Sequence, residues 1–572
     1  MMLWHRTLAG VVLLCMVSPA CNHNKKKGEL VSGTDNPLTD SVAFRDTVSE
    51  VAWVEGLRRM RVRGYGIVAG LGTHGSSECP RGIRHRLVQE MYKMEQFAER
   101  GRDALPITPE QIIDDRDTAV VMVEGEIPAA AQVGDRFDLT VRALSGTQTT
   151  SLEGGRLYDC DLRIQREVSG GSIEGKRLAT GTGPMSINPW SKPESAATQV
   201  NLRIGAILGG GKVEKTRRLR LVLEHPSYRQ AIAMANCINT RFPRQRKVAD
   251  GQTPAHVKLR IPREYADDPK HFLDVVRHLY LPTTPGFLDC RAAALAEEIL
   301  DPDAPHMDIV LAFEGIGRTT LPLLHKLYGD ARPHVSFHAG LAGMRLEDKA
   351  AIEPVAACAL NPRSPYRPAA IRALAAAKTM YRPASVLRTL LDDADPRIRV
   401  MAYEGLCKSR DDAVVSTDIG GDSFRFDIVP CGGRNLIYAT RTRERRIALL
   451  GGTIRCVPPV FFCDAEGTIT ITADQDDQKL TLLRKARFRD RVSPPIPVSL
   501  NVADLIPMLG DDPAVQNGEL VSGLAIPYSL VVKALADLCR SNSINADFML
   551  EQATITEMFG PLREGGRGES EL

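Results

Sequence analysis

The sequence predicts an α+β protein of several domains, in which mixed α/β regions are interrupted by an α-solenoid. Three observations predict this class. Strand and helix patterns alternate over 42–282, an alanine- and leucine-rich stretch with a recurring signature follows over 283–413, and strand patterns return from 414. The 572 residues suffice for roughly three or four such domains.

The first twenty residues have the features of a secretory signal peptide. The apolar run 8–17 is too short to span a bilayer, and small residues up to Ala20 suit a cleavage site. Cys21 follows directly, so a lipid-bearing Cys21 is an open alternative, although Ser18 stands where lipoprotein signals usually have leucine. The polar segment 21–41 is expected to be a flexible tether.

A glycine-rich stretch over 63–72 surrounds a short apolar run and predicts a buried strand between glycine turns. Such a stretch suits either a phosphate-binding loop or a tightly packed core. The spacing Gly70-x-Gly72-x-x-Gly75 matches the dinucleotide fingerprint, but residues 76–80 place the next helix too late to hold a pyrophosphate. We therefore favour a structural role for the motif residues Gly64, Tyr65, Gly66, Gly70 and Gly72.

The rest of the first region is expected to alternate strands and helices. One or two strands over 42–62 would bury Trp53 and Val54. A helix over 84–99 would turn Leu87, Met91, Met94 and Ala98 to one face, and strands are expected over 118–127, 136–143 and 158–168. Residues 170–198, rich in glycine, serine and proline, are expected to form an exposed loop.

A strand–helix–strand–helix unit closes this region. Leu219, Leu221 and Leu223 alternate in the first strand, and Val257, Leu259 and Ile261 in the second. The helices would bury Ile232, Ala235, Ile238 and Phe242, and then, after Asp268, the set Phe272, Val275, Val276 and Leu279.

The alanine- and leucine-rich region repeats a short signature at Ala312, Ala370 and Ala402, the last two 32 residues apart. Helix pairs at such a period resemble HEAT repeats, and Asp395 followed by proline is typical of a step that opens a helix of this kind. An insertion of this type would present an extended surface to a protein partner.

The β-rich region 414–510 is expected to contain strands over 447–456, 467–473 and 478–488 and a short helix over 501–508. The segment 511–563 is expected to be helical, with helices over 527–540 and 545–559. The glycine- and charge-rich tail 564–572 is expected to be disordered.

No set of residues in the sequence assembles an active site or a metal site. His334 and His338 share a helix spacing, but no third ligand is evident, and the 12 cysteines include no CxxC pair. Asp114, Asp115 and Asp117 read most simply as a solvated turn. The net charge of +3 argues against a dedicated nucleic-acid binder. We therefore expect no enzyme, no cofactor and no metal.

Motifs along the chain resemble, in the same order, the bacterial flagellar P-ring protein family. Residues 64–71 are similar to its Gly-Tyr-Gly-Leu-Val-x-Gly-Leu stretch, and 133–141 to its Pro-Gly-x-Arg-x-Asp-Val-Thr-Val strand. Further similar segments are 118–128, 151–157, 211–242, 451–455, 467–472 and 530–535. The resemblance covers 42–282 and 414–560.

The resemblance implies a periplasmic structural subunit of the flagellar basal body. Many copies would close head to tail into a P-ring that encircles the rod as a bushing. It implies the rod and L-ring proteins as partners, with peptidoglycan as a further candidate. The helical insertion and a lipidated Cys21 depart from the family. They keep open an alternative, a periplasmic scaffold that binds an unknown protein through HEAT-like repeats outside a flagellum.

Overall fold

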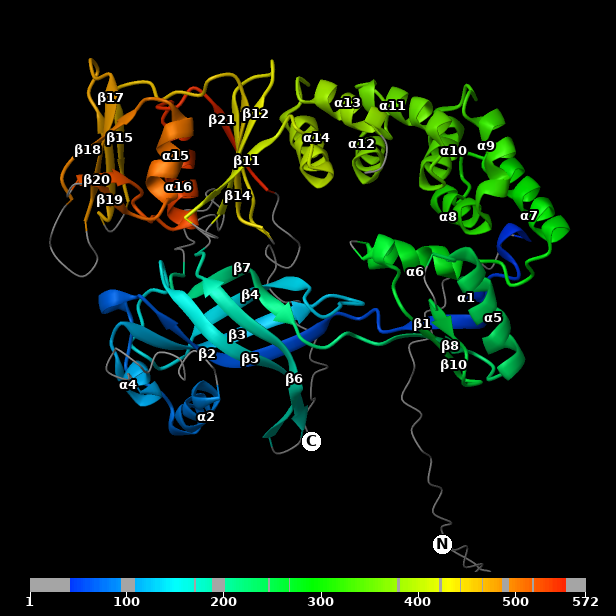
Figure 1. The fold of residues 1–572 in the computed structure, drawn as a ribbon, viewed down its shortest axis with the longest axis horizontal. Helices are drawn as coiled ribbons and strands as arrows, with labels where there is room; N and C mark the ends of the chain where they lie inside the picture. Colours follow the sequence, from blue (N-terminus) through cyan, green and yellow to red (C-terminus); the bar gives the residue numbers. More distant parts are fainter. Residues whose placement is uncertain are drawn as a thin grey trace, which may run out of the picture.

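The computed structural model describes residues 42–93, 108–168, 171–187, 201–244, 247–266, 268–377, 381–420, 424–442, 444–464, 467–485, 493–516 and 519–551. The expected signal peptide, tether and tail, with Cys21, lie outside them, as do Met94 and Ala98. Figure 1 shows an α+β chain that begins in a small sheet with helices, forms a barrel and returns to the small sheet. It then runs through an arch of helices to a β-rich region above the barrel. No described helix is long and apolar enough to cross a membrane.

Six strands form a closed barrel in the order β2-β3-β4-β7-β6-β5. The expected alternation in β4 is confirmed, since Phe137, Leu139 and Val141 are all buried. Helices α2 and α4 pack outside β2 and β3, where Leu87 and Met91 join a small second core. The elements are β2 (Met60–Ala69), α2 (Arg81–Tyr92), α4 (Pro109–Asp114), β3 (Thr118–Ile127), β4 (Arg136–Ala143), β5 (Arg156–Val168), β6 (Gly171–Pro184) and β7 (Ile204–Val213).

The expectation of an exposed loop over 170–198 is wrong for its first half, because residues 171–184 form strand β6. This strand pairs with β5 and β7 and closes the barrel. Its glycines make room for neighbouring side chains: a Cβ on Gly181 would lie 2.8 Å from Leu139 Cδ1. Glycine here marks a close approach inside a barrel rather than a loop.

A four-stranded sheet in the order β1-β8-β10-β9 carries α5 and α6 on one face. The expected second helix is confirmed, since Phe272, Val275, Val276 and Leu279 are buried. The elements are α1 (Val48–Val51), β1 (Ala52–Glu55), β8 (Leu219–Leu223), α5 (Tyr228–Arg241), β9 (Ala249–Asp250), β10 (His256–Leu259) and α6 (Pro269–Arg277).

Two burial predictions in this unit are wrong. Trp53 is 45% exposed, while Val54 packs against the core. Neighbours in a strand point to opposite faces, so the two could not both face inward. In α5, Ile232 is 51% exposed and the inward row begins one residue earlier, at Ala231.

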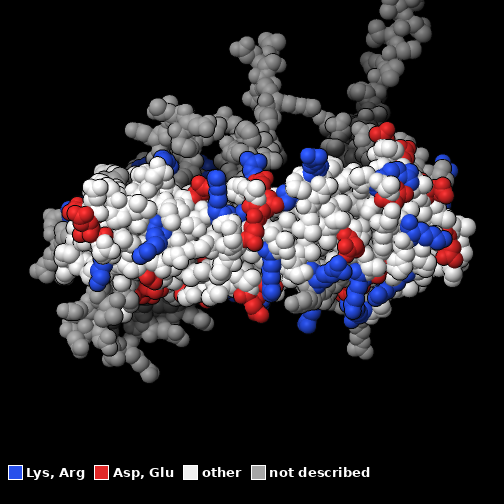
Figure 2. Space-filling model, turned by 90° about the horizontal axis from the view of Figure 1, so that it is seen from above, with Lys and Arg blue, Asp and Glu red and all other residues white. Residues whose placement is uncertain are grey.

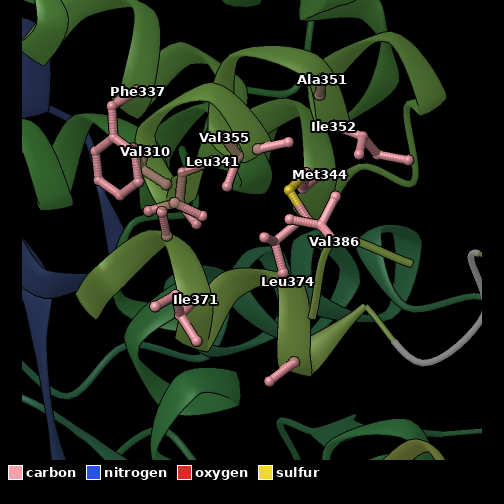
Figure 3. Packing of buried hydrophobic residues seen from close by; sticks show 14 of the residues in the cluster. Val310, Phe337, Leu341, Met344, Ala351, Ile352, Val355, Ile371, Leu374 and Val386 are labelled. Atoms are coloured by element: carbon pink, nitrogen blue, oxygen red, sulfur yellow. The ribbon is translucent and has the colours of Figure 1, made fainter. Parts of the chain in front are cut away.

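Eight α-helices follow in the described residues between 285 and 409 and form the arch in Figure 1. Their side chains interdigitate in one continuous core, where Leu341, Val355 and Ile371 come from successive helices (Figure 3). They are α7 (Pro285–Glu298), α8 (His306–Ile316), α9 (Leu321–Leu327), α10 (Pro333–Arg345), α11 (Ile352–Leu360), α12 (Arg367–Ala376), α13 (Tyr381–Leu390) and α14 (Pro396–Ser409).

The last region contains two larger sheets, in the orders β11-β12-β14-β13-β21 and β15-β16-β17-β18, and a two-stranded sheet, β19-β20, which lies in the segment 511–563 that was expected to be helical. Helices α15 and α16 lie between the two larger sheets and share one core with both (Figure 1). The elements are β11 (Val415–Ile419), β12 (Phe424–Pro430), β13 (Leu436–Ala439), β14 (Arg446–Gly451), β15 (Val460–Cys463), β16 (Ile469–Ala473), β17 (Lys479–Arg484), β18 (Ile496–Ser499), α15 (Val502–Gly510), β19 (Ala514–Gln516), β20 (Glu519–Ser522), α16 (Tyr528–Arg540) and β21 (Asp547–Leu550).

The expected helix over 545–559 is wrong where the structure describes it. Residues 547–550 form β21, which pairs in parallel with β13, and residues from 552 onward lie outside the described part. A short apolar run fits a strand or a helix equally well, and the free edge of β13 decides between them.

Candidate functional site

The glycine motif belongs to strand β2 and the loop that follows it. Gly64 and Gly66 lie within the strand, not in a turn. A Cβ on Gly64 would stand 2.1 Å from the carbonyl oxygen of Asp161, and one on Gly66 would stand 2.8 Å from Leu157 Cδ1. Both contacts are with β5, so these glycines allow two barrel strands to approach closely.

Gly70 and Gly72 form the turn after β2, with φ of +83° and +62°. Their backbone N–H groups donate to the carboxylate of Asp117, with N···O distances of 3.3 Å and 2.6 Å. Leu71 N–H donates to the Asp117 carbonyl at 3.0 Å. Asp117 thus holds this loop in place, a role that the interpretation as a solvated turn missed.

The same contacts account for the loop's resemblance to a phosphate-binding site. Backbone N–H groups that would face a phosphate already bind a carboxylate of the chain itself. Residues Gly72–His74 form only a single 3-10 turn, and α2 begins at Arg81, after residues 75–80, which lie in neither a helix nor a strand. The geometry therefore favours a packed loop over a nucleotide site.

His334 and His338 both lie on α10, but they belong to a packed cluster. The His338 ring stacks on His306 with a centroid separation of 4.6 Å, and its Nδ1 bonds the His334 carbonyl oxygen at 2.6 Å. Burial lowers the pKa of His338 to about 4, so the ring is neutral at pH 7. Among the described residues, no three His, Cys, Asp or Glu side chains could hold a metal ion.

A buried carboxylate joins the small sheet unit to the arch of helices. Glu314 of α8 is 1% exposed, and its Oε1 lies 2.9 Å from Nε2 of His271 on α6. Its Oε2 lies 3.5 Å from Nη1 of Arg345 on α10, while its backbone carbonyl accepts from Arg241 of α5. Burial, and then the charge of Glu314, raise the pKa of Tyr265. Polar contacts of the single residue Glu314 thus connect four helices, α5, α6, α8 and α10.

A second buried network joins the other end of the arch to the C-terminal sheets. Asp427 of β12 is fully buried and accepts from the hydroxyls of Tyr403 and Ser416 and from Arg446 Nη1, the last at 2.6 Å. Arg399 of α14, 2% exposed, donates to the Leu391 carbonyl at 2.7 Å and also to carbonyls of the C-terminal region. The arch is therefore anchored at both ends by buried charges.

Neither network was visible in the sequence. A lone Glu in a helix is usually a solvated residue, and the burial of Glu314 arises only when α6 and α10 pack over it. One signal was available, because the apolar residues around Glu314 leave α8 without a polar face.

The ten cysteines in the described part of the chain are all free thiols. Figure 2 shows acidic and basic side chains interspersed over the face seen from above. Together with the net charge of +3, this mixture gives no large field of one sign on that face.

The fold and the geometry define a class of protein: a multidomain α+β scaffold in which the side chain of Asp117 fills the glycine loop. Residues 47–285, less than half of the chain, match the family model for the flagellar P-ring protein. The matched segment spans the barrel and the small sheet unit and ends where α7 begins, at Pro285.

Individual flagellar P-ring proteins show the same relationship. That of Syntrophotalea carbinolica is 26% identical over 236 residues, which cover 40% of this chain and 58% of the relative. That of Aquifex aeolicus is 26% identical over 253 residues, 43% of this chain and 64% of the relative. That of Anaeromyxobacter dehalogenans is 29% identical over 245 residues, 41% and 59% respectively. The chain thus spans less than two thirds of these relatives.

Proposed function

We propose that this protein is a structural subunit of the flagellar basal-body P-ring, which assembles in the periplasm into a ring around the rod. One observation carries the proposal: the segment of the P-ring family coincides with two complete structural units, the barrel and the small sheet unit. In the described part of the chain, Asp117 fills the glycine loop and the buried charges of Glu314 and Asp427 are paired, which supports a structural role. Rod and L-ring proteins, and peptidoglycan, are the partners we propose.

We further propose that residues 283–413 form a HEAT-like α-solenoid that acts as a rigid bridge. The recurring small residues support a repeat, since Ala312, Ala370 and Ala402 are each fully buried. Gly405 supports it too, because a Cβ there would lie 2.8 Å from the Ala375 Cβ. The networks at Glu314 and Asp427 attach both ends of the arch to the neighbouring domains. This favours a rigid connection (a strut) over a domain that is attached at one end only.

The rest of the organisation is proposed on the sequence. The segments are the signal peptide, the tether, the first α+β region, the helical region, the β-rich region, the C-terminal segment and the tail, at 1–20, 21–41, 42–282, 283–413, 414–510, 511–563 and 564–572. Lipid on Cys21 would anchor the subunit to a membrane. The second candidate function, a periplasmic scaffold outside a flagellum, is favoured by the anchored helical arch, which the matched family segment does not include.

Electron microscopy of purified basal bodies tests the first function. Cells that lack this protein should give basal bodies without the periplasmic ring, and the full-length chain should restore it. An intact ring in the deletion strain would refute the proposal. Normal motility together with loss of an envelope complex would instead support the scaffold.

Deleting the arch is a poor test of its role, because the partners of Glu314 and Asp427 outside the arch would lose their buried contacts and the rest of the protein would be destabilised. Paired surface substitutions on the arch are cleaner. If they leave the ring intact but abolish capture of a periplasmic protein, the arch is a binding platform. If no such substitution has an effect while Glu314→Gln weakens the ring, the arch is a strut.

A further inference from the structure

The sheet β15–β18 has one face without a partner among the described residues. Its other face packs on α15 and α16. On the open face, Phe461, Thr472, Thr481 and Pro497 form one cross-strand row. Phe461 is 70% exposed. We call this the sheet surface; it also includes Cys463, Thr470 and Leu483.

Helix α5 also has an outward face with apolar side chains. Tyr228 and Ile232, one turn apart, are 60% and 51% exposed, and Ala233 is exposed beside them. The opposite side of the helix supplies the buried row. We call these three residues, with Arg229, the helix surface.

These two surfaces are unlike in structure and lie toward opposite ends of the molecule's long axis (Figure 1). A ring of identical subunits joined head to tail needs two different surfaces on each copy that fit one another. An exposed aromatic in each surface suits the centre of such a contact, where aromatic residues are enriched.

The charges at the edges are complementary. The turn after β16 carries Asp474, Asp476 and Asp477, all exposed, with Lys479 offsetting one of them. Arg229, within the helix surface, is exposed and makes no ion pair with any described residue. An acidic turn on one copy and an arginine on the next would orient the apolar contact.

We propose that the helix surface of one copy docks on the sheet surface of the next and that this contact closes the ring. The inference rests on the proposed P-ring function and deepens it by naming the two faces. It makes the C-terminal region, outside the matched family segment, one half of the subunit contact.

Cross-linking tests the pairing of surfaces. Cys463 is a native exposed thiol on the sheet surface, so Ile232→Cys would place a second thiol opposite it. With Cys290→Ser removing the other exposed thiol of the described chain, a short bismaleimide should convert isolated rings into a ladder of covalent multimers. The ladder should vanish with Cys463→Ser. Leu360→Cys, similarly exposed on α11, is the matched control and should give no ladder through Cys463.

A charge exchange tests the orientation. Arg229→Asp and Asp476→Arg should each reduce assembly about fivefold to tenfold, and both together in one chain should restore it, because every contact then regains a pair. Asp476 is chosen because Asp477 holds its own turn through the Asp474 N–H. Equal thermal unfolding midpoints would confirm that the single variants fold.

The outcomes separate the two proposals. Rings that form but give no Cys463-dependent ladder, or a double charge variant no better than either single one, would overturn the surface pairing while leaving the P-ring function intact. Basal bodies that keep their ring without this protein would overturn the P-ring function itself, and the pairing with it.

Discussion

Replacing single glycines with alanine tests whether close packing explains the glycine-rich stretch. At Gly64 the new methyl would stand 2.1 Å from a backbone oxygen of β5, and at Gly66 it would stand 2.8 Å from the Leu157 methyl. Real Cβ atoms essentially never lie within 3.0 Å of such a neighbour, so Gly64→Ala requires β5 to move by about 1 Å. At Gly66 the contact is with the end of the Leu157 side chain, which yields more readily than a backbone atom.

We expect Gly64→Ala to lower the free energy of unfolding by about 3 kcal/mol or more, and Gly66→Ala by about 1–2 kcal/mol. Gly82 is the matched control, because it lies exposed in α2 with nothing within 4 Å of a Cβ. Gly82→Ala should raise the free energy of unfolding by up to about 1 kcal/mol through helix propensity.

Urea unfolding of the full chain, followed by circular dichroism, measures the three variants. Hydrogen exchange of the β2 and β5 amides assigns the loss to the barrel. Unfolding of Gly64→Ala at the parent's urea midpoint, or a Gly64→Ala variant more stable than Gly66→Ala, would refute close packing as the role of these glycines.

Three further changes probe the buried polar groups. Glu314→Gln should lower the free energy of unfolding by urea by about 2–4 kcal/mol, whereas Glu347→Gln at the surface should lower it by under about 0.5 kcal/mol. Equal losses in the two variants would contradict the role of Glu314 in joining the small sheet unit to the arch. Asp427→Asn should lower the free energy of unfolding by about 3–5 kcal/mol and speed proteolysis between the arch and the C-terminal sheets. An unchanged rate of cleavage would contradict the role of Asp427 in anchoring the arch. His338 has a folded pKa of about 4, below the unfolded value of about 6.5, so its stabilisation is complete above pH 6.5 and declines toward pH 4. Stability should fall by about 2 kcal/mol from pH 7 to pH 5, and His338→Phe should remove most of that fall; an unaltered pH profile would refute it.

Periodic patterns were the most predictable part of the fold. The alternation in β4 and the apolar row of α6 each follow from one face of one element, and both are buried as expected. The errors arose where one signal has two physical meanings. Glycines in 171–184 read as a loop but make space inside a barrel, and the apolar run at 547–550 read as a helix but extends a sheet.

The site was less predictable than the fold, because its residues meet across long stretches of chain. The glycines of the loop were identified, but their partner Asp117 lies 47 residues after Gly70 and was interpreted as a solvated residue. His271 and Glu314, 43 residues apart, gave no sign in the sequence that they meet.

The sequence by itself determined most of the strands and helices, the place of the helical region and the resemblance to the P-ring family, which the family model bears out over 47–285. These follow from periodicity and motifs, which are local properties of the chain. Only the tertiary structure decided the closure of the barrel through β6, the filling of the glycine loop by Asp117 and the anchoring of the arch at Glu314 and Asp427. Each depends on burying polar or backbone groups against distant partners, and such burial exists only once the elements have packed.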